Sequence, residues 1–366
     1  MSVTLTTKQL SRRRKVIFRI TSLCLSILAG LTGSELILRL FVEQESKRLA
    51  VYDEVLGWRG RPYGEGTYVI KADGIRVPFR YNNLGFRDEI VSPRLRFPRI
   101  MMLGDSFVES LEVPFENSFP ALTENRLKKE FGSCEVVSVG SQGYSTAQEL
   151  LAYRRYHPIV EPDAVMLFFY CGNDFEDNLR RNFAYLDESN DLTFPNTKEA
   201  NWKIQFKHFQ RWLYESSHVV FLLKNTLQSW TNLEITPQAK KVTSSGAEYQ
   251  REITSQLLLR LAKEVRASGA KFSVVIIPER DRLLEGNIER PRVVAELCAA
   301  EGIDCLDLTP FLSEQHYFEH DVHFNDAGHK RTADLVVEFA RKHALIGQKA
   351  SGAGEGGAVQ LIGQSE

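Results

Sequence analysis

Short apolar runs that alternate with helical segments constrain the fold of this chain more than any other feature. Each run is four to seven residues long, and most of its residues are apolar. Runs of this length without a polar face are typical of strands in a parallel sheet that is covered on both sides. The five runs are Ile100–Leu103, Val136–Val139, Ala164–Tyr170, Phe272–Ile277 and Ile303–Leu308.

Helical segments separate most of these runs, and one follows the last run. Pro291 stands at the start of one segment, where a proline suits the first helical position. This alternation predicts an α/β fold, a flavodoxin-like three-layer sandwich with a five-stranded parallel sheet. The predicted helices are Glu116–Phe131, Ala147–Tyr156, Tyr249–Ala267, Pro291–Ala300 and Asp326–His343.

A basic cluster followed by an apolar segment opens the chain. The sequence "SRRRK" at residues 11–15 precedes residues 16–42, which are long enough to cross a membrane. Arg19 and Arg39 can extend towards opposite interfaces, whereas Glu35 has no such explanation. We therefore predict an N-terminal transmembrane helix that contains one unexplained carboxylate.

This segment fits either an uncleaved signal-anchor or a cleaved signal peptide. No clean small-x-small cleavage site lies near Gly33, which favours a signal-anchor over residues 16–42. The basic flank indicates that residues 1–15 form a cytoplasmic tail and that the rest is exported. The expected location is the bacterial inner membrane, single-pass, with the main domain in the periplasm.

Three further regions flank or interrupt the predicted α/β domain of residues 99–345. Residues 43–98 form a β-rich preface, because "GTYVIKADGIRVPFRYNN" contains two β-prone runs around Asp73-Gly74. Residues 176–245 form a mostly helical insertion. Residues 346–366 are dominated by glycine and small polar residues, so we expect a disordered tail.

Aromatic side chains recur at near-helical spacing in the insertion. Such spacing fits either a sugar-stacking surface or the buried face of a lid or cover helix, and we favour the buried face. The aromatic residues are Trp202, Phe206, Phe209, Trp212 and Tyr214.

Charge and cysteine content exclude some classes of function. The formal net charge is −1, so no basic field indicates a nucleic-acid partner. None of the five cysteines forms a CxxC pair, and we predict neither a metal nor a cofactor. Cys298 and Cys305 can pair in an oxidising compartment, which the sequence does not decide.

Small and polar residues follow the predicted strands. Because the carboxyl ends of parallel strands meet at one edge of a sheet, these residues should gather there. They comprise a hydroxyl, a Gly-rich turn, an asparagine and an Asp/His pair, which together suit nucleophilic acyl chemistry. The stretches are "GDS" at 104–106, "GSQGYST" at 140–146, "CGNDFEDN" at 171–178 and "HDVHFNDAGH" at 320–329.

These four stretches resemble, in content and order, the conserved blocks of the SGNH/GDSL hydrolase superfamily. The resemblance covers residues 99–343. The N-terminal anchor, the "GWR" and "NNLGFRD" motifs of the preface and the opening "GDSF" resemble membrane-anchored bacterial members that are often linked with cell-surface polysaccharides.

The resemblance implies a role for each site residue. Ser106 would be the nucleophile and His323 its base, because a serine hydroxyl needs an adjacent base. Asp321 would orient the imidazole. The N–H groups of Ser106 and Gly143 and the side-chain amide of Asn173 would donate hydrogen bonds to the oxyanion.

One motif departs from the common family pattern. The usual spacing is Asp-x-x-His, whereas this chain has Asp-x-His at Asp321 and His323. That spacing also occurs in, and here resembles, polysaccharide O-acetyltransferases of the alginate type. His320 is the only rival base, Asp105 suits a turn, and His329 suits a surface or helix-start position.

Three functions follow from these patterns. The leading hypothesis is a serine esterase that hydrolyses acyl, in particular acetyl, esters of a cell-surface glycan or glycolipid through an acyl-serine intermediate. The first alternative is an O-acetyltransferase that modifies an exopolysaccharide with the same Ser-His-Asp site. The second is a non-catalytic polysaccharide assembly module, against which the complete set of site residues argues.

Overall fold

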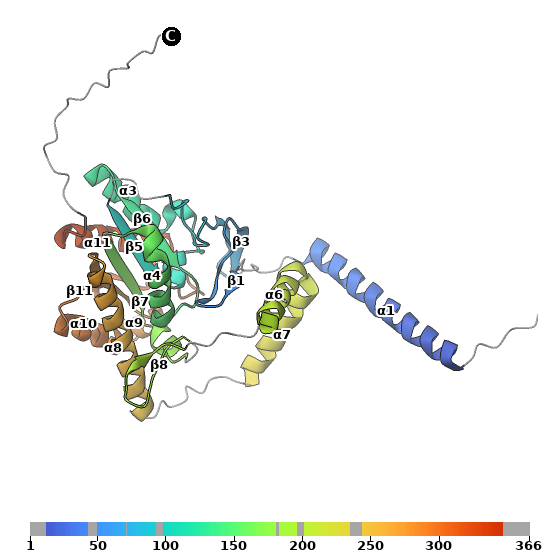
Figure 1. The fold of residues 1–366 in the computed structure, drawn as a ribbon. Coiled ribbons are helices and arrows are strands. Elements are labelled where there is room, and N and C mark those ends of the chain that lie inside the picture. Colours follow the sequence, from blue (N-terminus) through green and yellow to red (C-terminus); the bar gives the residue numbers. More distant parts are fainter. Residues whose placement is uncertain are drawn as a thin grey trace, which may run out of the picture.

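A computed structural model describes residues 12–42, 50–70, 72–92, 98–180, 183–195, 201–234 and 244–346. Its centre is a five-stranded parallel sheet with the strand order β11-β10-β7-β5-β6 (Figure 1). This is the flavodoxin-like order, in which the first strand of the domain lies between the second and the third. The predicted α/β fold class is confirmed.

The strands of this sheet begin and end close to the predicted bounds. Every residue of β5 and β7 is buried, and so is every residue of β6 and β10 except the first. This is expected of strands covered on both faces. The bounds are β5 Arg99–Gly104, β6 Glu135–Gly140, β7 Ala164–Tyr170, β10 Lys271–Ile277 and β11 Asp304–Asp307.

Helices cover both faces of the sheet, and each face has its own apolar core. Side chains of α4, α8 and α10 join one core, and those of α3 and α11 join the other. Alternate strand residues contribute to the two cores, as the pleat requires. The bounds are α3 Phe119–Phe131, α4 Thr146–Val160, α8 Ser244–Ala267, α10 Glu289–Ala300 and α11 Asp326–Lys342.

Three predicted helix starts are wrong by two to five residues, and the largest difference is at α8, which begins at Ser244 rather than Tyr249. Helix α10 begins at Glu289, so Pro291 occupies its third position. A proline is tolerated there because the first-turn N–H groups have no intrahelical partner. Helix α3 begins at Phe119, after a short 3-10 turn over Phe115–Asn117, because Ser118 caps it.

The preface consists of two antiparallel strand pairs. The strands β1 (Ala50–Asp53) and β2 (Gly57–Gly60) form one pair. The strands β3 (Glu65–Ile70) and β4 (Ile75–Arg80) form the predicted hairpin, and Gly74 has a φ of +66° in its turn. The expected small β preface is therefore present.

Short elements complete the described chain. The strands β8 (Tyr185–Leu186) and β9 (Leu192–Thr193) pair within the insertion. Three short helices lie near the ends of β5, β7 and β10, namely α2 Ser106–Glu109, α5 Asp174–Asp177 and α9 Arg280–Leu284. The tail predicted to be disordered lies, from residue 347 on, outside the described residues, as do residues 1–11.

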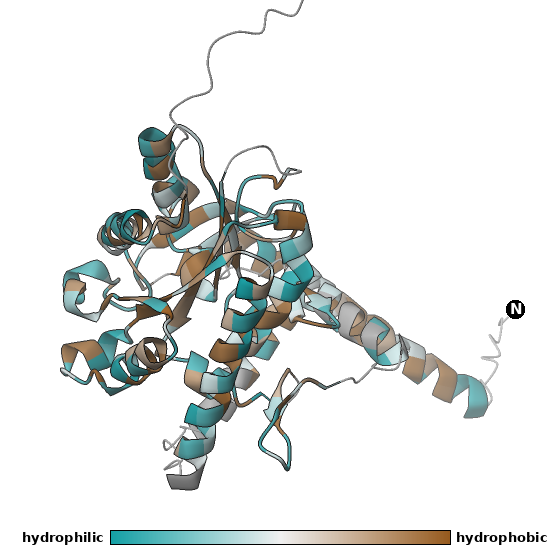
Figure 2. Ribbon diagram, turned by 60° about the vertical axis from the view of Figure 1, so that its left-hand side comes forward, coloured by the Kyte–Doolittle hydropathy of each residue, from teal (hydrophilic) through white to brown (hydrophobic). Residues whose placement is uncertain are grey.

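An apolar N-terminal helix and a helical hairpin project from this domain. Helix α1 (Arg12–Phe41) has 30 residues and is long and apolar enough to cross a membrane. It extends away from the sheet (Figure 1), and the residues at its N-terminal end are hydrophilic (Figure 2). Helices α6 (Asn201–Ser216) and α7 (His218–Glu234) form the hairpin, which lies between α1 and the preface.

The prediction of a buried aromatic face in the insertion is wrong. Four of the five aromatic side chains are more than half exposed, and only Tyr214 is partly covered. Near-helical spacing identifies one face of a helix but does not show what that face contacts. The exposed side chains are Trp202, Phe206, Phe209 and Trp212.

Candidate active site

A tight turn at the end of β5 places Ser106 at the carboxyl edge of the sheet. Gly104 ends the strand, and a Cβ atom there would lie 2.4 Å from Val108 Cγ2, so a side chain does not fit. The Asp105 carboxylate accepts a hydrogen bond of 3.0 Å from the Phe107 N–H, which is the predicted turn role. Ser106 therefore begins helix α2 in a fixed position.

The segment after β11 brings His323 to Ser106. The distance between His323 Nε2 and Ser106 Oγ is 2.8 Å. The imidazole packs against Phe107 with 5.1 Å between ring centroids, and the neighbouring Phe324 is fully buried. A hydroxyl and an imidazole in this relation have the geometry of a nucleophile and its base.

Asp321 holds the other side of the imidazole. Its carboxylate oxygen Oδ1 contacts His323 Nδ1 directly and also accepts a 2.8 Å hydrogen bond from the His323 backbone N–H. Nδ1 must carry a proton to donate to a carboxylate, which leaves Nε2 free to accept the Ser106 proton. Although burial opposes it, bonding to His323 lowers the pKa of Asp321.

A second carboxylate faces the same nitrogen. Glu112 Oε1 lies 3.5 Å from His323 Nδ1, and its side chain is 1% exposed. Neither of its carboxylate oxygens accepts a hydrogen bond from another described residue. Sequence reasoning missed Glu112, because it lies in the loop after α2 and matches no motif. Its nearness in sequence to Ser106 was the one available signal.

The preface supports the loop that carries Glu112. Arg87, which is buried, donates to the carbonyl oxygens of Ser110 and Val113 on either side of it. Burial lowers the pKa of Arg87, and the negative charge of Glu112 opposes this. The arginine of the "NNLGFRD" motif thus fixes a loop next to His323.

Neighbouring carboxylates change the protonation of His323. Burial alone would lower its pKa, but Glu112, followed by the hydrogen bond and the charge of Asp321, raises it to about 9. The pKa of Glu112 is itself raised by its burial. The site therefore favours the imidazolium, which is the form that the base takes once it has accepted a proton.

The two predicted oxyanion donors beyond Ser106 follow the strands on either side of β5. Gly143 lies in the turn after β6 with a φ of +73°, and Asn173 precedes α5 after β7. The Asn173 amide nitrogen donates to Asp177 over 3.2 Å, and its oxygen is buried without a partner. Among the described residues, no hydrogen bond joins Gly143 or Asn173 to Ser106.

Among the described residues, neither of the other two histidines of the last motif forms a hydrogen bond to Ser106. His320 is exposed, and its backbone N–H donates to Asp73 over 2.9 Å. His329 is the fourth residue of α11, so of its two predicted positions the helix start is correct and the surface is wrong. It is 1% exposed, Nδ1 accepts from the Phe119 N–H over 3.2 Å, and burial lowers its pKa to about 3.

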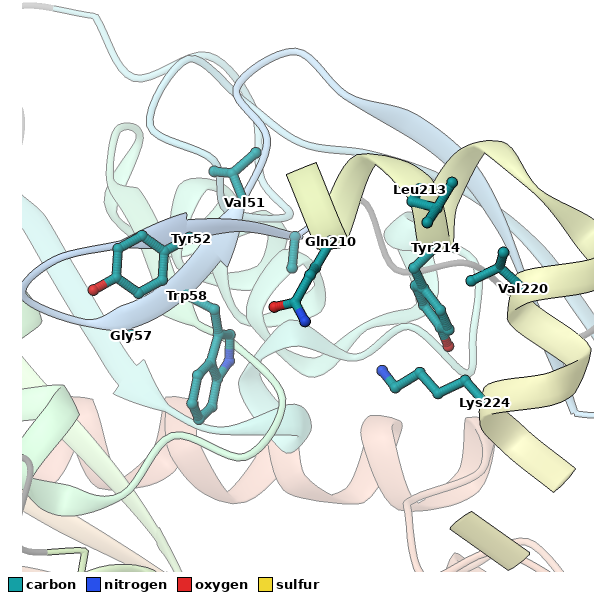
Figure 3. A pocket seen from close by; sticks show the side chains of 10 residues that line it. Val51, Tyr52, Gly57, Trp58, Gln210, Leu213, Tyr214, Val220 and Lys224 are labelled. Carbon is teal, nitrogen blue, oxygen red and sulfur yellow. The ribbon is translucent and has the colours of Figure 1, made fainter. Parts of the chain in front are cut away.

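A cavity of about 550 Å³ lies between the preface and the helical hairpin (Figure 3). Tyr52 and Trp58 line it from the preface, and Leu213 and Tyr214 line it from α6. None of the residues Ser106, Asp321 and His323 lines it. Trp58 Nε1 donates over 3.1 Å to the carbonyl of the residue before Gly143, so one wall of the cavity contacts the turn after β6.

No protein-family model and no curated protein matches the chain, whereas several solved structures are similar to it in fold. Its fold is similar to solved structures of TesA (16% identity, TM-score 0.40, 68% of this chain and 99% of that chain) and of the psychrotrophic esterase EstA from Pseudoalteromonas sp. (12%, 0.40, 67% and 98%). It is also similar to a lipase/acylhydrolase from Enterococcus faecalis (15%, 0.37, 68% and 97%). At these identities the likeness gives no guide to a substrate.

Proposed function

We propose that the chain is a serine esterase of the SGNH/GDSL type. One observation carries the proposal: Ser106, His323 and Asp321 form a continuous hydrogen-bonded chain, with Ser106 Oγ and His323 Nε2 2.8 Å apart. Two segments that lie 217 residues apart in the sequence meet here, and ordinary packing does not require a hydroxyl, an imidazole and a carboxylate in this order.

The chain's own residues perform the following steps in this mechanism. His323 Nε2 takes the proton of Ser106 as Oγ attacks the ester carbonyl, and Asp321 stabilises the imidazolium. The carbonyl oxygen becomes an oxyanion, for which the N–H groups of Ser106 and Gly143 are the proposed donors. The C–O bond to the alcohol then breaks, and His323 returns the proton to the departing alcohol.

Water completes the reaction. His323 takes a proton from a water molecule, which attacks the acyl-serine. The bond from the acyl carbon to Ser106 Oγ then breaks, His323 returns the proton to Oγ, and the free acid leaves. The Asn173 amide is a third proposed donor, and it would have to exchange its bond to Asp177 for one to the oxyanion.

The substrate and the location belong to the same proposal. An acetyl ester of a cell-surface glycan or glycolipid is favoured by the resemblance of the preface and the apolar helix to membrane-anchored relatives of this kind. Helix α1 would anchor the enzyme in the bacterial inner membrane with the α/β domain in the periplasm, because "SRRRK" flanks the helix at its N-terminus. A reporter fused after residue 345 should be active only if it requires export.

The Asp-x-His spacing favours one alternative, an exopolysaccharide O-acetyltransferase. In that reaction a sugar hydroxyl, rather than water, attacks the acyl group on Ser106, and the same base serves both steps. The outcome depends on how well an acceptor excludes water from the acyl-enzyme.

One experiment separates the two reactions. Purified full-length protein in detergent would be incubated with p-nitrophenyl acetate, with and without a glycan acceptor. We expect free acetate in both samples and none with Ser106→Ala. Acetylated glycan at the expense of acetate would establish the transferase instead, and inactivity of the folded wild-type protein on every ester tested would contradict both.

A further inference from the structure

The turn between α6 and α7 is bonded to a carboxylate of the apolar helix α1. Glu35 accepts a hydrogen bond of 2.8 Å from the Ser217 hydroxyl, and its two oxygens accept from the N–H groups of His218 and Val219 over 2.9 and 3.1 Å. These N–H groups are in the first turn of α7, where no intrahelical acceptor exists. A residue 183 positions away in the sequence therefore shares the capping of α7 with Ser217, whose hydroxyl accepts from the Val220 N–H over 3.2 Å.

Arg39 completes the contact from the next turn of α1. It pairs with Glu35 over 2.8 Å and donates over 2.7 Å to the carbonyl of Ser216, the last residue of α6. The carboxylate thus meets the positive end of one helix dipole, and the guanidinium meets the negative end of the other. This arrangement explains why an apolar helix contains a Glu/Arg pair near its C-terminal end.

The hairpin held in this way exposes a large apolar surface. On α6, Trp202, Phe206 and Phe209 follow the i, i+4, i+7 pattern of one helix face, and each is at least 53% exposed. On α7, Leu222, Leu223 and Leu227 are 43–60% exposed. An apolar surface of this extent indicates an interaction site rather than ordinary exposure.

The position of the contact on α1 points to the occupant. Glu35 lies six residues before Phe41, the end of α1, which corresponds to about 9 Å along a helix. If α1 crosses a bilayer, the turn of the hairpin lies at the depth of the interface. Tryptophan and other amphipathic aromatic side chains are enriched at this depth, and amphipathic helices can lie there.

We propose that helices α6 and α7 lie in the outer interface of the membrane, with their exposed aromatic and leucine side chains among the lipid acyl chains. The proposal rests on the proposed anchoring by α1. The bilayer is favoured over a protein partner because exposed Trp212 and Leu222 lie within about one helical turn of the residues bonded to α1, the helix proposed to enter the membrane. It also places the cavity beneath the hairpin, lined in part by Leu213 and Val220, beside the membrane surface.

Depth-dependent fluorescence quenching tests the proposal on the full chain. A variant carrying Trp58→Phe and Trp230→Phe keeps only Trp202 and Trp212 as reporters. In nanodiscs we expect strong quenching by brominated lipid chains and weak quenching by aqueous acrylamide. The reverse pattern in protein that stays in the nanodiscs would overturn the proposal and leave the anchor intact.

Two further outcomes would also overturn the proposal. Protein that does not insert into nanodiscs at all would contradict the anchor itself. Protection from both quenchers, together with crosslinked dimers, would show that a second copy covers the surface. Ester turnover of the wild-type protein is measured in the same nanodiscs, so failure of this proposal is distinguishable from failure of the proposed esterase function.

Substitutions on α1 test the contact. Glu35→Ala should raise acrylamide quenching of Trp202 and Trp212, whereas membrane insertion persists. Ser34→Ala is the matched control, because Ser34 is exposed on the adjacent position and makes no described contact. Glu35→Gln, which keeps an acceptor oxygen, should lie between the two. Unchanged quenching in Glu35→Ala would show that the contact does not hold the hairpin.

Discussion

The carboxyl edge of the sheet and the junction of α1 with the hairpin each join distant parts of the chain, and each contains a carboxylate. At the sheet edge, Asp321 orients His323 towards Ser106, 217 residues earlier. At the junction, Glu35 caps α7 across 183 residues. The first arrangement has the geometry of a reaction site, whereas the second holds the helical hairpin against α1. A bonded carboxylate therefore indicates function only together with the group that it orients.

The largest effect is expected from removing the nucleophile or its base. Ser106→Ala and His323→Ala should each lower kcat for p-nitrophenyl acetate by about 10⁵–10⁶-fold, and the double variant should be scarcely worse, because the two groups act as one unit. Circular dichroism would confirm that the variants are folded. Full activity in Ser106→Ala would place the chemistry elsewhere, and the sheet edge would then resemble the junction in being structural only.

Asp321→Asn should have the next largest effect. The amide disfavours the tautomer in which Nδ1 carries the proton, and in a related triad this change costs about 10⁴-fold in kcat. The measurement is kcat at saturating ester, with Asp326→Asn, an exposed residue of the same segment, as the control. A loss of less than about tenfold would mean that Glu112 takes over the orienting role.

The sequence led to Ser106 and His323, which meet at the sheet edge, but gave no sign of the junction. Residues such as Ser106 follow buried strands, and parallel strands bring their carboxyl ends together whatever lies between them. In the sequence, Glu35 stands out only as a carboxylate within an apolar helix. The pattern of a helix does not show which distant loop donates hydrogen bonds to one of its side chains. The aromatic face of α6 was wrongly predicted to be buried for the same reason, because periodicity identifies one face of a helix but not what that face contacts.

Glu112 was missed although it lies beside His323. It stands outside the strands, and only the path of the loop fixed by Arg87 brings it to the imidazole. For Asn173, the sequence predicts the position of the residue but not the hydrogen bond of its amide. Its position after β7 follows from the topology, whereas its hydrogen bond to Asp177 depends on side-chain rotation that no motif encodes.

Glu112→Gln should change the pH dependence more than the rate. The pKa of His323 is raised to about 9, so its neutral, basic form is scarce at neutral pH and kcat/KM should rise as the pH rises towards 9. Removing the negative charge of Glu112 lowers the His323 pKa, and this limb of the profile should move to lower pH. A profile identical to that of the wild type would show that Glu112 does not act on His323.

A small effect is expected from the rival histidine. No described residue hydrogen-bonds the ring of His320, and the residue is exposed, so His320→Ala should keep kcat/KM within about twofold of the wild type. Loss of turnover in His320→Ala together with full activity in His323→Ala would show that the base was assigned to the wrong residue.

The smallest effect on turnover is expected at the junction, and it is the sharpest test of the comparison. Glu35→Ala removes the acceptor of two hydrogen bonds from α7 and one from Ser217, but none of these groups contacts Ser106, Asp321 or His323. Turnover of the water-soluble p-nitrophenyl acetate by full-length protein in detergent should therefore match that of Ser34→Ala. The same pair of variants would be compared in nanodiscs on an acetylated glycolipid presented in the bilayer. A lower kcat/KM for Glu35→Ala on that substrate alone would mean that the hairpin presents membrane-borne esters to the sheet edge, whereas a loss on the soluble ester as well would show that the two regions are not independent.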